Sequence, residues 1–164
     1  MNILLIIFLG GGTGATFRYL ISELVNKLIP TSIGYGTISV NLIGAFLMGA
    51  LFYFISSKLL INEQVKIFLT IGFLGGFTTF SSFNLDFYNL IEASNYLQAI
   101  IYLSISVIGS IILFFVGAAS GIAIVTLMNN SKKGREGAKG ITEEYTTSSG
   151  VKHTAKKDRE DHIV

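Results

Sequence analysis

The chain has 164 residues, of which 51% are apolar and only 13% are charged; because soluble domains carry about 25% charged residues, the sequence predicts an integral membrane protein. The net charge of +2 belongs entirely to residues 129–164, where basic and acidic residues alternate, so nucleic-acid binding is not expected. The chain has no cysteine and both histidines lie in that same segment, which excludes disulfides, thiolate or histidine metal sites and cysteine or histidine catalysis from the apolar body.

Four apolar stretches are long enough to cross a bilayer, which takes roughly 20 mostly apolar residues in a helix. They cover residues 3–21, 35–55, 65–85 and 97–127. Helix is expected in each, because lipid offers no partners for unpaired backbone groups. The first stretch is not expected to be a cleaved signal peptide, because no basic residue precedes it and Arg18 and Tyr19 occupy the place of small cleavage-site residues.

The first span contains Gly-Gly-Gly-Thr-Gly-Ala at residues 10–15, which fits the dinucleotide-binding pattern G-x-G-x-x-A. That fold needs alternating strands and helices, and an acidic ribose ligand about 20 residues further on. The sequence has neither. We predict instead that these glycines let two helices approach each other closely within the membrane.

Arg18 is the one ionisable residue near the interior of a predicted span. Two interpretations stay open: its side chain reaches out to the membrane surface, or its charge attracts an anion. No carboxylate lies within the four stretches, which argues against proton-coupled transport.

Asn41 lies in the middle of the second span. Its amide can donate two hydrogen bonds to an anion and still accept one. It can equally bridge two helices, as such residues often do in membranes, so both roles remain open.

The third span carries Gly72, Gly75 and Gly76, and three glycines within five residues predict a helix broken at mid-membrane. A break frees backbone carbonyls, which are oxygen ligands suited to Na⁺ or K⁺. Beyond it, Phe80 and Phe83 share one helix face, and the positive edges of their rings can receive an anion without trapping it. Four hydroxyl residues adjoin them, namely Thr78, Thr79, Ser81 and Ser82.

In the fourth span, Tyr102, Ser106 and Ser110 recur every four residues, which places three hydroxyl groups along one helix face. Such a row can replace water around a moving anion. Alternatively, each serine bonds back to its own helix.

Residues 129–164 are rich in charged residues, serine, threonine and glycine, and this composition predicts a disordered tail after a membrane domain of residues 1–128. The membrane domain carries equal numbers of basic and acidic residues and is expected to insert in either orientation. Lys132, Lys133 and Arg135 in the tail favour cytoplasmic termini.

Three sequence blocks resemble the CrcB/Fluc family of fluoride channels. They are Gly-Gly-x-Gly-Ala-x-x-Arg-Tyr at residues 11–19, Gly-Thr-x-x-Val-Asn-x-x-Gly at 36–44 and Gly-Gly-Phe-Thr-Thr-Phe-Ser-x-Phe at 75–83. The resemblance covers residues 1–128. Two positions depart from the family pattern: Ser82 stands in place of a usual threonine, and Asp86 in place of a common glutamate.

The resemblance implies passive fluoride export through two pores in an antiparallel, dual-topology homodimer. The backbone carbonyls of Gly75 and Thr78 would hold a structural Na⁺ at the dimer centre. The residues implied for the fluoride pathway are Asn41, Phe80, Ser81, Phe83, Tyr102, Ser106 and Ser110, with Arg18 attracting anions near the vestibule.

The sequence therefore predicts a multi-pass protein of the cell (inner or plasma) membrane that is not an enzyme and uses no organic cofactor. Two other classes stay open. A four-span drug or cation exporter would need a carboxylate within the membrane, and a scaffold held by small-residue packing would pass no ions.

Overall fold

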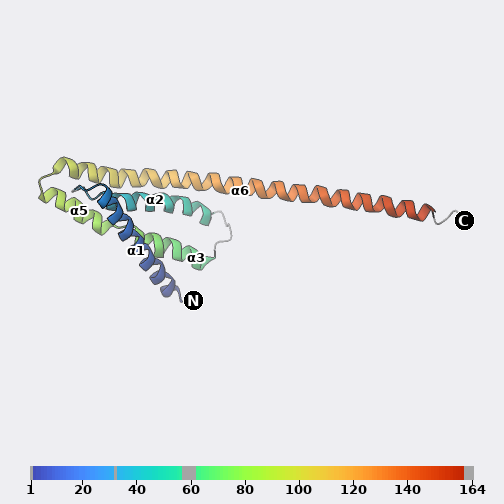
Figure 1. Ribbon diagram of the computed structural model, residues 1–164, viewed down its shortest axis with the longest axis horizontal. Helices are drawn as coiled ribbons and strands as arrows, with labels where there is room; N and C mark the ends of the chain where they lie inside the picture. Colours follow the sequence, from blue (N-terminus) through green and yellow to red (C-terminus); the bar gives the residue numbers. More distant parts are fainter. Residues whose placement is uncertain (1, 32, 57–61, 161–164) are drawn as a thin grey trace. The chain divides into compact units, whose positions relative to one another are not determined.

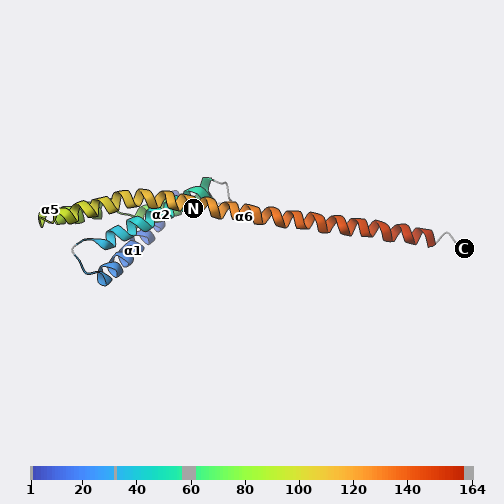
Figure 2. The ribbon, with the colours of Figure 1, turned by 90° about the horizontal axis from the view of Figure 1, so that it is seen from above.

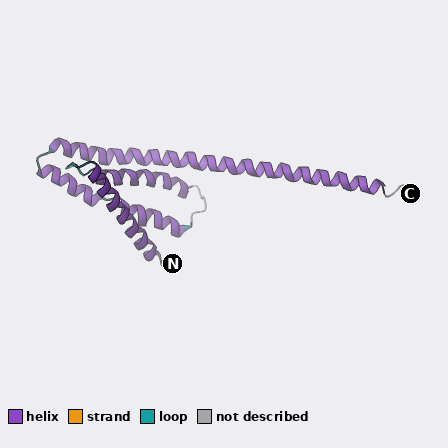
Figure 3. Ribbon diagram, in the orientation of Figure 1, coloured by secondary structure: helices purple, strands orange, loops and turns teal. Residues whose placement is uncertain are grey.

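The protein is helical throughout the part described by the computed structural model, residues 2–31, 33–56 and 62–160, apart from short connections (Figure 3). Its elements are α1 (Ile3–Leu28), α2 (Tyr35–Ser56), α3 (Glu63–Ile67), η1 (Phe68–Leu74), α4 (Gly75–Phe77), α5 (Phe80–Glu92) and α6 (Tyr96–Glu160). Four helical stretches are long and apolar enough to cross a membrane: Ile3–Leu28, Tyr35–Ile55, Glu63–Glu92 and Tyr96–Arg135. The predicted class and the four predicted spans are confirmed.

The chain divides into two compact units, Met1–Ala123 and Ile124–Val164, and the boundary falls inside α6. The sequence placed this boundary between residues 128 and 129. The backbone of α6 continues as a helix to Glu160, where the composition predicts disorder. Forming the first turn of a helix is the unfavourable step in helix formation. Because the apolar part of α6 is already helical, the polar residues that follow can extend the same helix.

Within the first unit, α1 packs against η1, α4 and α2 (Figure 1). The contact with η1 and α4 is backbone to backbone. A Cβ atom added at Gly10 would lie 2.9 Å from the Cα of Gly72, and one added at Gly14 would collide with the carbonyl of Phe73. The predicted close approach of two helices at the N-terminal glycines is therefore confirmed at Gly10 and Gly14. We call this contact the glycine seam.

The second helix, α2, lies alongside the part of α6 that belongs to the first unit, as two views agree (Figures 1 and 2). Here too glycines set the spacing: a Cβ atom at Gly49 would meet the Phe114 carbonyl, and one at Gly117 would meet the Phe46 carbonyl. Nearer the start of α6, a small apolar core joins α2, α5 and α6 through Ile38, Phe83, Leu90, Ala99 and Tyr102.

The helical stretch Glu63–Glu92 changes conformation along its length. Residues 68–74 form a π-helix, an arrangement that is rare and is frequent at functional sites. After α4, Thr78 (φ −82°, ψ 153°) and Thr79 (φ −147°, ψ 119°) are extended, and α5 begins at Phe80. The sequence attributes the expected break to the glycines. In the structure Gly72, Gly75 and Gly76 are helical, and the extended residues directly follow them.

Large apolar side chains on all four long helices face outward, for example Leu4 and Phe8, which are 71% and 74% exposed. In water such a surface would be costly, at about 25 cal/mol for each Å² of apolar area. A lipid environment removes this cost, and the chain is accordingly a multi-pass membrane protein.

Candidate functional site

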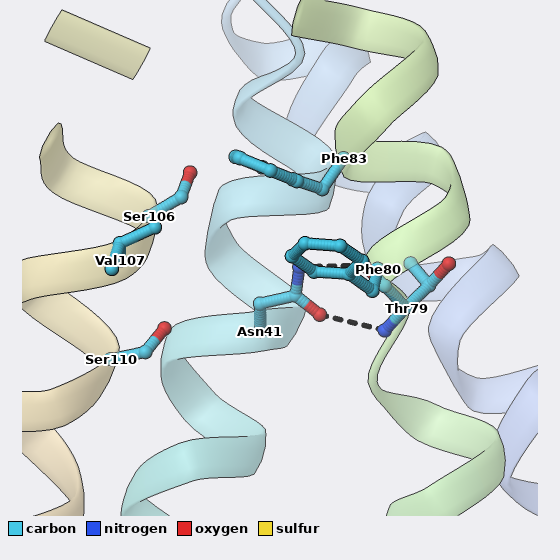
Figure 4. Close-up of a pocket in the computed structure, with 7 residues that line it drawn as sticks. All are labelled: Asn41, Thr79, Phe80, Phe83, Ser106, Val107 and Ser110. Atoms are coloured by element: carbon cyan, nitrogen blue, oxygen red, sulfur yellow. Dashed lines mark hydrogen bonds between the residues drawn. The ribbon is translucent and has the colours of Figure 1, made fainter. Parts of the chain in front are cut away.

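A pocket of about 290 Å³ opens between α2, α5 and α6, all within the first unit. Its lining residues are Asn41, Thr79, Phe80, Phe83, Ser106, Val107 and Ser110 (Figure 4). Five of the eight residues expected along an anion pathway therefore surround one space. None of the lining side chains carries a charge.

Asn41 fastens α2 to the extended residues before α5. Its Nδ2 donates to the Thr79 carbonyl at 2.9 Å, and its Oδ1 accepts from the Thr79 N–H at 2.7 Å. The two bonds together fix the orientation of the amide. A helix-bridging role, one of the two left open by the sequence, is therefore present. The amide has two N–H bonds and one is used, so the other can still donate within the pocket.

This fastening changes the partners of two backbone carbonyls. In an uninterrupted α-helix, the N–H of residue 79 would donate to Gly75 and that of residue 82 to Thr78. Instead, the Thr79 N–H donates to Asn41, and the Ser82 N–H donates to the Thr79 hydroxyl at 3.1 Å. The carbonyls of Gly75 and Thr78 consequently lose their usual helical donors.

Ser106 is the pocket's most unusual polar residue. Its side chain is 6% exposed, and its Oγ has no hydrogen-bond partner among the described residues. Back-bonding to its own helix, the alternative left open by the sequence, is absent at this residue. Further along the same helix, Ser120 does back-bond, donating to the Val116 carbonyl at 2.9 Å. Buried polar atoms without partners are rare in folded proteins, so Ser106 calls for a partner that the pocket can admit.

Two phenylalanine rings form the α5 side of the pocket. Phe83 is 5% exposed, whereas Phe80 is 71% exposed. Their ring centroids lie 5.2 Å apart with an interplanar angle of 28°. In Figure 4 the Phe83 ring extends from α5 toward the Ser106 side of the pocket. The positive edge of a ring is the part that attracts an anion.

Tyr102 supports the site from behind and does not line the pocket. It is fully buried, its ring stacks on Phe83 at 5.3 Å, and its hydroxyl donates to Asp86 Oδ2 at 3.1 Å. The sequence placed Asp86 in a connection after the third span. The structure places it within α5, half-buried, so the long helical stretch Glu63–Glu92 extends past the predicted span and includes this carboxylate. The sequence argument against proton coupling is correspondingly weaker.

Two expected pathway residues lie elsewhere. Ser81 is exposed, and its hydroxyl pairs with that of Thr79 at 3.1 Å. Arg18 is half-buried on α1 and is not one of the pocket's lining residues.

The sequence interpretation gave no individual role to Thr79 and did not single out Val107 or Gln98. Thr79 lines the pocket and caps α5 by accepting from the Ser82 N–H. Gln98 lies four residues before Tyr102, and its Oε1 is buried without a partner among the described residues. The four-residue period that connects Tyr102, Ser106 and Ser110 extends to Gln98 and could have identified it.

Comparisons with known proteins identify the family of the chain. Residues 5–118 match the family model described as "CrcB-like protein, Camphor Resistance (CrcB)". A protein of Phocaeicola vulgatus named fluoride-specific ion channel FluC is 40% identical over 122 residues, covering 74% of this chain and 97% of that protein. A protein of the same name from Coxiella burnetii is 46% identical over 125 residues, covering 76% of this chain and 97% of that protein. The chain belongs to the CrcB family, a family of ion channels.

Proposed function

We propose that this protein is a subunit of a fluoride channel that lets fluoride leave the cell passively. The observation that carries the proposal is the Ser106 hydroxyl, which has no partner among the described residues and lines one uncharged pocket together with Asn41, Phe80 and Phe83. Each of these groups presents a hydrogen or a positive ring edge to the space, as an anion requires.

The pocket lining carries no charged side chain, and this favours fluoride passing through the pocket over fluoride binding there tightly. A lysine or arginine in the pocket would hold fluoride tightly, because ion pairs strengthen when water is excluded. Neutral donors and ring edges replace part of the water around fluoride and still release it. Conduction requires this balance between entering a site and leaving it.

We further propose that two copies assemble as an antiparallel homodimer with two pores. The pocket is open, and Phe80 at its edge is 71% exposed, so a second copy can complete its wall. Equal numbers of basic and acidic residues in positions 1–128 are compatible with insertion in both orientations. In this arrangement the stretch Glu63–Glu92 crosses as a broken helix, with Thr78 and Thr79 near mid-membrane.

The carbonyls of Gly75 and Thr78 suit a structural Na⁺, because their usual helical donors are engaged elsewhere. Neutral carbonyl oxygens can replace the hydration shell of a monovalent cation. One chain offers two such oxygens, and an antiparallel pair would offer four around the symmetry axis. Within the described residues, no cluster of His, Cys, Asp or Glu offers another metal site.

Fluoride efflux from proteoliposomes tests the proposed function, with a fluoride electrode as the readout and chloride as the comparison ion. We expect rapid fluoride release without chloride release, and loss of that release in F80I and F83I variants that elute as the folded protein does. Release should persist when a proton uncoupler collapses any pH gradient. If release required a proton gradient, the drug or cation exporter would be favoured, with Asp86 as its carboxylate. If a folded dimer released no fluoride, the protein would be a membrane scaffold that passes no ions.

A further inference from the structure

The end of α6 lies beyond the part of the chain that matches the family model. The family model ends at residue 118, and the relatives from P. vulgatus and C. burnetii are aligned over 97% of their own length yet match only 74% and 76% of this chain. The proposed transport function therefore leaves the second unit, Ile124–Val164, unexplained.

A groove on this unit begins where the apolar part of α6 ends. Its lining residues are Leu127, Met128, Ser131, Lys132 and Arg135, and all five are exposed. Spacings of four residues place them on one side of the helix. At a rise of 1.5 Å per residue, the two cationic positions follow the two apolar ones by about 6 to 12 Å along the helix. We call this surface the basic groove.

Three basic residues gather at the basic groove, and Glu136 directly follows them in the sequence. No acidic residue occurs between Glu92 and Glu136, so Lys132, Lys133 and Arg135 form an uninterrupted basic cluster. Arginine binds phosphate oxygens with two parallel hydrogen bonds, and lysine acts as a mobile point charge. The Ser131 hydroxyl can donate a further bond, while Leu127 and Met128, 68% and 49% exposed, offer apolar surface directly beside them.

We propose that the basic groove binds an anionic phospholipid. Its phosphate would lie between Lys132 and Arg135, with Ser131 as an additional donor, and the start of an acyl chain would lie against Leu127 and Met128. This order of apolar surface followed by cations matches a phospholipid and not a free phosphate or a nucleic acid, which have no hydrocarbon portion. A basic cluster of this kind beside a membrane helix is expected at a negatively charged leaflet.

Titration of the full-length protein with phosphatidylglycerol and phosphatidylcholine, followed by native mass spectrometry, tests this proposal. The double variant K132Q/R135Q should bind phosphatidylglycerol roughly twenty-five-fold more weakly, because each of the two basic residues near a surface contributes about a fivefold preference. The control K156Q/K157Q removes the same charge further along the chain and should bind normally. Equal binding of the two lipids, equal loss in both variants, or full competition by inorganic phosphate would overturn the proposal.

A second and independent observation concerns Gln98. Its amide is half-buried one turn before Tyr102, and its Oε1 has no partner among the described residues. An amide presents donors when turned by 180°, and the two orientations look alike in shape. Resting on the proposed function, we infer that Gln98 is a further donor to fluoride, outside the pocket and on the helix face that carries Ser106 and Ser110.

Replacing Gln98 with leucine keeps the volume and removes the donor. We expect fluoride efflux from Q98L to fall roughly tenfold, the loss that one hydrogen bond to an anion implies. The control Q64L changes an exposed glutamine of α3 and should conduct normally. If the wild-type protein conducts fluoride and Q98L conducts equally well, the role of Gln98 is refuted while the proposed channel stands.

Discussion

The glycine seam and the pocket lie in the same helical unit and are packed in opposite ways: the helices touch at the seam, and they leave a space at the pocket. At the glycine seam, α1 meets η1 and α4 through backbone atoms, and no side chain fits between Gly14 and Phe73. At the pocket, α2, α5 and α6 surround a space of about 290 Å³, and the Ser106 hydroxyl has no partner among the described residues. The seam leaves no space between its helices, whereas the pocket leaves space beside a buried hydroxyl, as the proposed fluoride pathway requires.

The largest expected effect is at the seam. In G14L, the new side chain would collide with the Phe73 carbonyl, which belongs to a helix and cannot move away alone. We expect a loss of more than about 3 kcal/mol of stability and little folded protein. Size-exclusion chromatography and thermal unfolding in detergent measure this.

Gly12 provides a control for the seam on the same helix. A Cβ atom at Gly12 would meet nothing within 4 Å. G12A should therefore fold and conduct as the wild type does. Alanine is a better helix former than glycine, so helix propensity cannot make G12A harmful. Equal damage by G12A and G14L would show that the seam contact at Gly14 does not govern this part of α1.

The next effect is at Asn41, which belongs to both the fold and the pocket. N41L leaves the N–H and the carbonyl of Thr79 without their partners, at about 1 to 3 kcal/mol for each buried group. It also removes the donor that faces the pocket. We expect reduced thermal stability together with complete loss of fluoride efflux. A stable variant with normal efflux would contradict both roles.

The sequence anticipates the seam better than the pocket, for a physical reason. Glycine spacing is local, and close helix approach in a membrane follows from it without knowledge of the partner helix. The extended conformation of Thr78 and Thr79 depends on Asn41, which is 38 residues away. From glycine content alone, the break is therefore expected at Gly72, Gly75 and Gly76. The extended residues, Thr78 and Thr79, come directly after them.

The same limit applies to individual side chains of the site. Residue type and spacing single out Asn41, the phenylalanine pair and the serine row separately, and only the family resemblance unites them in one pathway. The structure gathers Asn41, Phe80, Phe83, Ser106 and Ser110 around one pocket. Spacing cannot reveal that the Tyr102 hydroxyl is committed to Asp86, because that bond joins two helices. Nor does polar composition predict the helix after Asn129, since helix continuation depends on the turns that precede it.

Ser106 and Ser120 allow the pocket to be tested with little effect on the fold. S106A removes a hydroxyl that has no partner among the described residues, so its thermal stability should match the wild type. Fluoride efflux should fall roughly tenfold, as expected for the loss of one hydrogen bond to an anion. S120A removes a hydroxyl already bonded to the Val116 carbonyl and should leave efflux unchanged. Normal efflux through S106A would mean that the open pocket does not carry fluoride.

The smallest expected effect separates support of the site from direct contact with the anion. Y102F keeps the ring that stacks on Phe83 and removes only the hydroxyl that donates to Asp86. Because the half-buried carboxylate can take another donor, we expect a loss of about 1 kcal/mol in stability and only a few-fold decrease in efflux. Y102A removes the ring as well, takes away one of the rings that stack on Phe83 and should abolish efflux. If Y102F alone abolishes efflux, the Tyr102 hydroxyl contacts fluoride directly, and the pathway extends past the pocket toward Asp86.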